Sequence, residues 1–239
     1  MKNLVWFRND LRLHDNPALS QACAKADQVV GIYIVTFKQW EEHNDSPNKI
    51  AFWFRSLIEL QKDLHKLNIP LCILKCDTYD DCPQKILEFA SANEIHNLYF
   101  NIEYPVNELK RDEQVQAVLE KMGTSCFSFH DQVIHVPGTL KTKAGTNFSV
   151  YSPFKRCWLA ELDYAMLEEH AIPTIKQPVS VNQQDEYDLH SYKQSNINQD
   201  LWPVGEESIQ KMIVNFLDRK GSDYKTDRNF PGLTATSMM

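Results

Sequence analysis

The chain of 239 residues has an ordinary globular composition, with 43% hydrophobic, 24% charged and 11% aromatic residues. Its seven glycines and eleven prolines exclude a collagen-like or low-complexity chain. The net charge of −7 argues against a protein that binds nucleic acid over most of its surface, because such binding depends on Lys and Arg neutralising phosphates. A local basic patch is compatible with this balance.

The N-terminus and the cysteines indicate a cytoplasmic protein. Met1 to Asn3 leads directly into a charged segment, without the apolar stretch of a signal peptide. The longest mostly apolar run, over residues 29–35, is too short to cross a bilayer. We therefore expect no membrane anchor and expect the six cysteines to be reduced, half-buried thiols. We expect no metal, because no Cys-x-x-Cys pair occurs and His65 and His96 are not spaced as zinc ligands.

The first 130 residues alternate between strand patterns and helix patterns. Apolar, often β-branched runs predict five strands, over 4–7, 29–35, 71–74, 98–100 and 126–129. Apolar residues at helical spacing predict four helices, over 18–24, 47–67, 83–92 and 106–122. This alternation predicts an α/β fold with a doubly wound, five-stranded parallel sheet and right-handed crossovers.

Ligands of such a sheet bind beyond the carboxyl ends of its strands. The loops expected there are 8–14, 37–45, 101–108 and the segment after residue 130. In the first loop, Arg8 or Arg12 is expected to pair with Asp10 or Asp15 and fix the turn. No G-x-G-x-x-G, P-loop or G-x-S-x-G sequence occurs, so the usual dinucleotide, phosphate and hydrolase sites are not indicated.

The periodic pattern breaks after residue 130. Turn-forming residues at 137–138 and 144–147 precede a helix expected over 153–169, and another amphipathic helix is expected over 202–217. Residues 178–200, rich in Gln, Asn and Asp, are interpreted as a linker rather than a core segment. We therefore expect an α/β domain at 1–130, an irregular and helical connector with an interdomain linker at 131–200, and the incomplete start of a helical domain at 201–239.

The segment from Leu4 to Leu19, LVWFRNDLRLHDNPAL, closely resembles the start of the DNA photolyase/cryptochrome family. Further matches follow in chain order: YSPFK at 151–155 with Trp158, WPVGE at 202–206, Tyr224 with Arg228, FP at 230–231 and TS at 236–237. The resemblance spans essentially the whole chain and is to the N-terminal half of a class I, folate-type cyclobutane pyrimidine dimer photolyase. It implies a Rossmann-like antenna domain followed by the truncated start of an all-α FAD-binding domain.

The resemblance also implies a light-driven carbon–carbon lyase acting on damaged DNA. In this family an antenna pigment collects near-UV or blue light and passes the energy to reduced FAD in the C-terminal helical domain. The excited flavin gives an electron to a pyrimidine dimer flipped out of the DNA, and the dimer splits. A damaged base costs less to extrude, because it is already poorly stacked. We expect a monomer that binds damaged DNA in its full-length form.

Three residues are assigned to the antenna by the resemblance. Folate-type relatives hold 5,10-methenyltetrahydrofolate with an Asn-Glu pair at the start of a helix and a His after the second strand, positions filled here by Asn107, Glu108 and His43. The chemistry agrees, because a carboxylate can accept both the ring N–H and the amino group of a pterin. The alternative is that Glu108 only complements the positive end of its helix. A deazaflavin or a second flavin is the other possible antenna.

The resemblance places a partial FAD site at the C-terminal end. The residues assigned to it are Tyr224, Thr236, Ser237, Met238 and Met239, and Arg228 is assigned to the DNA backbone. Two methionines stand where the family usually has a basic or polar residue and then Leu. We expect the 239-residue chain to contain no catalytic residue, to retain little FAD and to be inactive alone, because a cofactor needs most of its surface enclosed. Its five tryptophans are interpreted as core or crevice residues.

Other functions stay open on the sequence alone. A cryptochrome, in which light or redox state drives partner binding, shares the same N-terminal motifs. A stand-alone nucleotide- or flavin-binding module is compatible with the same fold, since one fold hosts many functions. A fragment that acts only through protein contacts is the third alternative.

Overall fold

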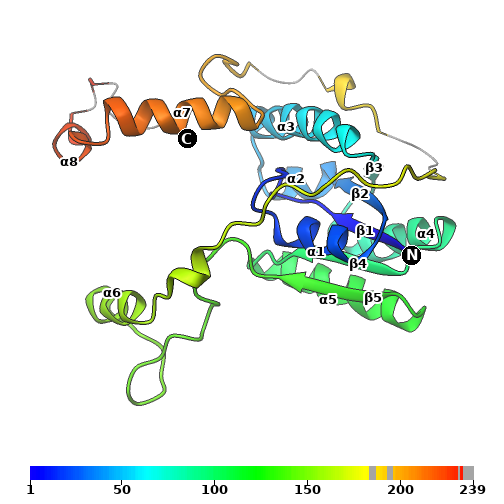
Figure 1. Cartoon of the computed structure of the whole chain (residues 1–239), viewed down its shortest axis with the longest axis horizontal. Coiled ribbons are helices and arrows are strands. Elements are labelled where there is room, and N and C mark those ends of the chain that lie inside the picture. The colour runs from blue at the N-terminus through cyan, green and yellow to red at the C-terminus, as the bar shows by residue number, and fades with distance from the viewer. Residues whose placement is uncertain (183–186, 193–195, 231, 234–239) are drawn as a thin grey trace.

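The computed structural model describes residues 1–182, 187–192, 196–230 and 232–233, and it contains a five-stranded parallel sheet (Figure 1). The strands lie in the order β3-β2-β1-β4-β5, and every neighbouring pair is parallel. Their bounds are β1 (Lys2–Trp6), β2 (Gln28–Val35), β3 (Leu71–Lys75), β4 (Asn97–Asn101) and β5 (Ser125–Phe129). The chain reverses its direction across the sheet between β1 and β4, so the predicted doubly wound fold is confirmed.

Four helices supply the side chains that cover the two faces of the sheet. One face packs against α1 (Pro17–Lys25) and α3 (Pro47–Lys66), and the other against α4 (Cys82–Ala92) and α5 (Val106–Lys121). Leu57 and Leu64 are fully buried on the first face, and Ile86 and Val115 on the second. Complete burial of a side chain of this size contributes about 1.5–3 kcal/mol to stability.

The first turns of α1 and α3 are fixed by the same local chemistry. The side-chain oxygen of Asn16 accepts from the backbone N–H of Leu19 at 3.1 Å, and Ser46 Oγ accepts from Asn48 N–H at 3.2 Å. A proline follows each capping residue, and its fixed φ suits the first helical position. These caps place the loops after β1 and β2 at the carboxyl edge of the sheet.

Three expected boundaries differ from the structure. Part of the loop expected over 37–45 is a short helix, α2 (Phe37–Glu42). The helix expected over 153–169 is α6 (Tyr151–Ala160) followed by a 3-10 turn (Tyr164–Leu167). Asp163 causes this break, because its carboxylate accepts from the N–H of Ala165 at 3.0 Å and caps a new turn.

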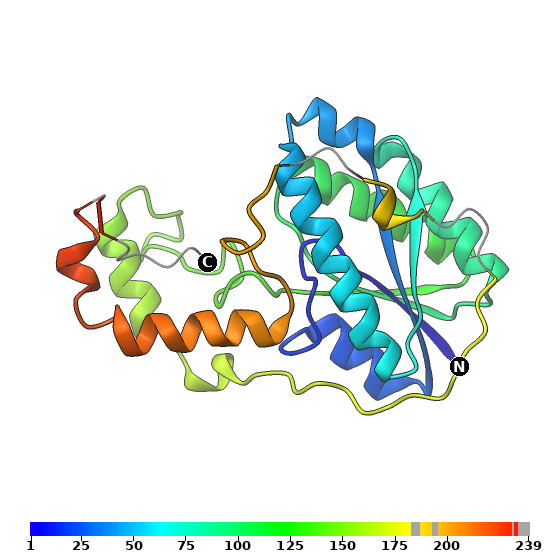
Figure 2. The ribbon, with the colours of Figure 1, turned by 90° about the horizontal axis from the view of Figure 1, so that it is seen from above.

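The last long helix begins later than expected. The amphipathic pattern predicted a helix from residue 202, whereas α7 (Glu206–Arg219) begins after Gly205, whose φ of +88° is outside the helical region. A single turn, α8 (Tyr224–Asp227), follows it. Both α6 and α7 project to the same side of the α/β domain (Figures 1 and 2).

The interpretation of residues 178–200 as a linker alone is wrong, because part of this segment packs on the α/β core. Leu189, in a 3-10 turn (Leu189–Ser191), is buried, and Tyr187 N–H donates to the carbonyl of Ile73 at 3.0 Å. The rings of Tyr187 and Tyr192 lie 5.7 and 5.2 Å from that of Phe54. The three residues that make these contacts lie in a polar stretch and are not spaced as in a helix or a strand. The hydrophobic pattern of the sequence therefore did not reveal them.

The structure also bears on the expectations for the cysteines, for metal binding and for membrane spans. None of the six cysteines, all of which the structure describes, is part of a disulfide; three are buried and three are half-buried. Within the described ranges, no three His, Cys, Asp or Glu side chains gather in a way that could hold a metal ion. None of the helices in that part of the chain combines the length and apolar character that a membrane span requires.

Candidate functional site

The structure brings His43, Asn107 and Glu108 to one rim at the carboxyl edge of the sheet. His43 ends α2, and the other two residues lie in the first turn of α5. Asn107 Nδ2 lies 3.4 Å from His43 Nε2, although 64 positions separate the two residues in the sequence. His43 and Asn107 are exposed and Glu108 is half-buried, so all three are accessible to a ligand.

Two residues that the sequence analysis missed complete this rim. Tyr79 lies in a 3-10 turn (Tyr79–Asp81) between β3 and α4; its hydroxyl donates to Glu108 Oε1 at 3.3 Å, and its ring packs edge-on against His43 at 5.9 Å. The side-chain oxygen of Gln39 accepts from the backbone N–H of Tyr79 at 3.1 Å. The side-chain nitrogen of Gln39, Nε2, lies 3.1 Å from Nε2 of His43. The spacing of Gln39 and His43, one helical turn apart, was the available signal, but it required α2 to be predicted.

The protonation state of Tyr79 supports its contact with Glu108. Burial is the main cause that raises the pKa of Tyr79 well above its ordinary value, and the neighbouring carboxylates of Glu108 and Glu103 act in the same direction. The phenol therefore remains a hydrogen-bond donor at neutral pH. Arg111, whose guanidinium lies 4.6 Å from the Tyr79 ring centroid, holds the ring from the other side.

The crevice beneath this rim is closed by side chains. Its cavity measures about 40 Å³, and Trp40 and Trp53, whose rings lie 5.2 Å apart, form part of its wall. Such a volume suffices for about one water molecule, whereas sites for cofactor-sized ligands enclose about 300–1,000 Å³. His43, Asn107 and Glu108 lie at this edge of the sheet, where we expected them, and their role in binding a ligand stays a prediction.

Charged residues line the same crevice and neutralise one another. Arg111 contacts Glu103 at 2.9 Å and Asp112 at 2.8 Å, and Arg8 lies 3.7 Å from Asp112. The two guanidinium groups lie 4.5 and 4.7 Å from the ring centroid of Trp6. Within the described residues, Nε and Nη1 of Arg8 are buried and lack a hydrogen-bond partner. These two nitrogen atoms of Arg8 can therefore donate to an acceptor atom in the crevice, whose volume suffices for about one water molecule.

The first loop is held differently from our expectation. Arg12 pairs with Asp131 at 2.6 Å rather than with Asp10, and it contacts Asp15 only through the backbone carbonyl at 2.5 Å. Asp10 is buried and accepts from the backbone N–H of Arg8 at 2.8 Å and from Asn101 Nδ2 at 2.6 Å. Asp10 therefore joins the ends of β1 and β4. Its role is structural, because its carboxylate is occupied by these donors.

Most of the chain matches one known protein family. The family model described as DNA photolyase matches residues 3–177. The chain belongs to the DNA photolyase family. It is 34% identical to the deoxyribodipyrimidine photo-lyase of Buchnera aphidicola, in a match that covers 100% of this chain and 49% of the relative. It is 32% identical to the deoxyribodipyrimidine photo-lyase of Escherichia coli, in a match that covers 99% of this chain and 50% of the relative. The chain thus spans about half the length of the curated relatives it matches, and this half is N-terminal.

Solved photolyase and cryptochrome structures share this fold. A bacterial class III photolyase from Agrobacterium tumefaciens superposes with a TM-score of 0.83 at 25% identity, over 98% of this chain and 48% of that chain. A cryptochrome from Synechocystis gives a TM-score of 0.79 at 19% identity, over 95% and 48%, which shows the fold alone. An archaeal photolyase from Sulfolobus tokodaii, solved with two FAD molecules, gives a TM-score of 0.65 at 22% identity. This match covers 89% of our chain and 46% of the archaeal chain.

The structure of this photolyase-family chain shows two of the residues assigned to flavin and DNA. Tyr224 is 38% exposed and packs edge-on against Phe216 at 5.7 Å, and the guanidinium of Arg228 lies 5.8 Å from the Tyr224 ring centroid. The other four assigned residues, Thr236, Ser237, Met238 and Met239, lie outside the described residues. The structure therefore brings Tyr224, the first residue of α8, and Arg228, which follows the helix, close to each other.

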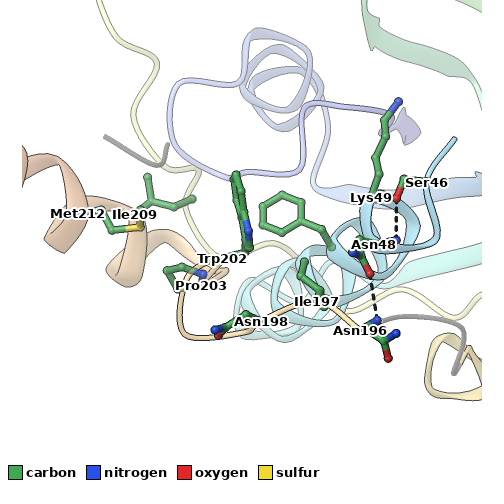
Figure 3. A pocket seen from close by; sticks show the side chains of 11 residues that line it. Ser46, Asn48, Lys49, Asn196, Ile197, Asn198, Trp202, Pro203, Ile209 and Met212 are labelled. Carbon is green, nitrogen blue, oxygen red and sulfur yellow. Dashed lines mark hydrogen bonds between the residues drawn. The ribbon is translucent and has the colours of Figure 1, made fainter. Parts of the chain in front are cut away.

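A second, larger cavity lies where the photolyase-type α/β domain meets the start of α7 (Figure 3). It measures about 640 Å³ and is lined mostly by apolar side chains, including Phe52, Trp202 and Ile209. One wall is closed by the backbone N–H of Asn196, which donates to Asn48 Oδ1 at 3.0 Å. Of the residues assigned to antenna, flavin or DNA, none that the structure describes lines this cavity. Trp202, expected as a core or crevice residue, belongs to it.

Proposed function

We propose that this chain is the antenna-bearing portion of a deoxyribodipyrimidine photolyase, an enzyme that repairs cyclobutane pyrimidine dimers in DNA with light. The observation that carries the proposal is the rim formed by His43, Asn107 and Glu108 on a photolyase fold. These residues come from separate parts of the sequence, and their polar groups face one accessible place. Neither the packing of the core nor the capping of α5 requires a histidine and an amide in contact there.

The donor set of the rim fits the pterin of 5,10-methenyltetrahydrofolate. Glu108 would accept from the ring N–H and the amino group, Asn107 would donate and accept, and His43 would donate to or stack on the ring. Tyr79 would keep the carboxylate of Glu108 oriented through its 3.3 Å hydrogen bond. When bound, the folate absorbs near-UV light and passes on the excitation. The closed crevice, with about 40 Å³ of space, disfavours a deazaflavin or a second flavin held beneath the rim.

The remaining functions belong to the full-length protein. We propose that Tyr224, with Thr236, Ser237, Met238 and Met239, contacts FAD there, and that Arg228 contacts the backbone of damaged DNA. FAD supplies the electron that splits the dimer. Tyr224 is 38% exposed in this chain, and a cofactor needs most of its surface enclosed. The 239-residue chain alone is therefore expected to show no flavin-dependent repair of dimer-containing DNA under near-UV light, and measurable turnover would contradict this.

Photolyase is favoured over the alternatives by the relatives. The relatives from Buchnera aphidicola and Escherichia coli, 34 and 32% identical over nearly the whole chain, are named as deoxyribodipyrimidine photo-lyases, whereas the Synechocystis cryptochrome is 19% identical. A stand-alone nucleotide-binding module would have an open crevice at the switch point of the sheet, and the crevice is filled here. We further propose a monomeric, cytoplasmic protein.

The antenna assignment is tested by titrating the purified chain with 5,10-methenyltetrahydrofolate and recording its near-UV absorption band. Binding to the rim should shift this band, and Glu108→Ala should weaken the affinity at least about tenfold, because a charge-assisted pair of hydrogen bonds is lost. Glu113→Ala, an exposed glutamate on the same helix, is the matched control. Equal affinities for the wild type and Glu108→Ala would remove Glu108 from the site.

A further inference from the structure

Two thiols flank the turn that carries Tyr79. Cys76 directly follows β3 and Cys82 is the first residue of α4, and their sulfur atoms lie 3.5 Å apart. Both sulfurs also lie near the same carbonyl oxygen, that of Thr78, at 3.4 Å from Cys76 and 3.7 Å from Cys82. This arrangement differs from that of an isolated cysteine, because two sulfurs meet side by side at one end of the closed crevice beneath the rim.

The ends of this turn are anchored, so the sulfurs are held near each other. Cys76 N–H donates to the carbonyl of Val35 on the neighbouring strand at 3.0 Å. Within the turn, Asp81 Oδ2 accepts from both the backbone N–H and the hydroxyl of Thr78, at 2.8 and 2.9 Å. A disulfide requires an S–S distance of about 2.05 Å. The sulfurs must therefore approach by about 1.5 Å, and the turn between them has to absorb the movement.

The residue enclosed by these cysteines is the one that joins the rim together. Tyr79 contacts Glu108 through its hydroxyl, His43 through its ring edge and Gln39 through its backbone N–H. Cys82 also lines the closed crevice. A change in the covalent state of the two sulfurs would therefore act on a short turn whose Tyr79 contacts the rim.

We propose that Cys76 and Cys82 form a reversible dithiol–disulfide site, whose oxidation displaces Tyr79 and weakens ligand binding at the rim. The oxidant is a peroxide or a small-molecule disulfide. With hydrogen peroxide, the half-buried sulfur of Cys76 takes one oxygen to become a sulfenic acid, and the other oxygen leaves as water. The sulfur of Cys82 then displaces that oxygen, which leaves as a second water, and the two electrons lost by the thiols reduce the peroxide. A thiol reductant reverses the reaction.

The resting state of this pair is the dithiol. The contact with Cys82 and burial both raise the pKa of Cys76, so its sulfur is protonated at neutral pH. Because the thiolate is the reactive form, oxidation is expected to be slow at neutral pH and faster as the pH rises. This pH dependence separates the pair from an exposed, reactive cysteine.

The first experiment maps the disulfide in the whole 239-residue chain. The protein is treated with hydrogen peroxide or oxidised glutathione, its remaining thiols are alkylated, and its peptides are identified by mass spectrometry. We expect a Cys76–Cys82 linkage that dithiothreitol reverses, that is lost in Cys76→Ser and in Cys82→Ser, and that persists in Cys126→Ser, a matched half-buried control. Full alkylation of both cysteines after oxidation of the wild-type protein would overturn the proposal, and this readout needs no variant to fold.

The second experiment tests whether the disulfide reaches the rim, and this part rests on the proposed function. Oxidised protein should bind 5,10-methenyltetrahydrofolate at least about fivefold more weakly than reduced protein, a coupling typical of linked sites. The ring resonances of His43 and Tyr79 should shift on oxidation in NMR spectra recorded without folate. If reduced protein fails to bind folate but the linkage and the shifts are present, the antenna assignment fails while the dithiol site stands. A linkage without shifts or a change in affinity would overturn the coupling.

Discussion

The α/β domain and the segment after residue 130 use their apolar residues in different ways. Among the residues that the structure describes, every buried hydrophobic side chain except Leu189 lies between residues 4 and 119. In contrast, α6 and α7 bury no residue, and Ile209, Val214 and Leu217 on α7 are 46, 53 and 64% exposed. Both regions have amphipathic helices. The comparison shows that a helical period predicts a helix but does not show that a partner surface is packed against it.

The reason for the difference is the sheet. Five parallel strands present two apolar faces, and helices connected by right-handed crossovers cover both of them at once. Within the described part of the chain, α6 and α7 bury no residue on such a surface. Helix α6 lies apart from the α/β domain, and α7 approaches that domain at its N-terminal end, where Glu206 lies 4.0 Å from His14 (Figures 1 and 2). Mutations should therefore lower the free energy of unfolding strongly in the α/β domain and weakly in α6 and α7. Measuring the stability of matched variants tests this difference.

The largest expected effect is at the buried charges of the α/β domain. Arg111→Ala leaves Glu103 and Asp112 buried without their close partner, which is expected to cost about 3–5 kcal/mol of unfolding free energy. Lys110→Ala is the matched control, because Lys110 is exposed and its contact with Asp80 is 3.9 Å long, so its cost should not exceed about 0.5 kcal/mol. Urea denaturation measures both. Similar losses would show that the buried network is solvated.

The contrast between the two regions is tested next by truncating one leucine and one isoleucine. Leu57 on α3 is fully buried, so Leu57→Ala should cost about 3 kcal/mol through lost burial and a residual cavity. Ile209 on α7 is 46% exposed, so Ile209→Ala should cost less than about 1 kcal/mol. Both changes introduce the best helix former, so helix propensity does not account for the expected loss at Leu57. Equal losses in urea denaturation would show that α7 belongs to the same cooperative core.

Sequence reasoning succeeded where the signal was local or regular. The five strands follow from apolar, often β-branched runs, and α3 follows from its regular apolar spacing together with the Ser46 cap. The family resemblance selected His43, Asn107 and Glu108, which no periodic pattern could have selected, and their role at an antenna site stays a prediction. Their proximity then followed from the rule that ligands bind at the carboxyl ends of parallel strands.

The missed features depend on contacts between distant positions. Tyr79 meets Gln39 across 40 positions and Glu108 across 29, and neither contact leaves a period in the sequence. Tyr187 and Leu189 are embedded in a polar stretch, so composition pointed to a linker although both pack on the core. The closed crevice was missed for the same reason, because Trp40 and Trp53 fill it from different helices. The composition of the sequence and the spacing of its residues do not specify how bulky side chains from different helices pack against one another.

The smallest expected effect concerns Tyr79 and its dependence on pH. Because burial raises the pKa of Tyr79 in the folded protein, the unfolded chain loses the phenolic proton first as the pH rises above about 10. The unfolded state then binds fewer protons than the native state, so stability falls with rising pH. The contribution of Tyr79 is complete below about pH 10 and is lost as the pH rises through the pKa of the folded state.

Tyr79→Phe removes this contribution and should flatten the decline. Urea denaturation at about pH 8 and about pH 11 should show a smaller loss of stability for Tyr79→Phe than for the wild type, by up to about 1.4 kcal/mol per pH unit. Tyr164→Phe, which changes an 83% exposed tyrosine after residue 130, is the control, and its decline should follow that of the wild type. If all three proteins lost stability in parallel, Tyr79 would be solvated, and the packing of the rim against Arg111 would have to be abandoned.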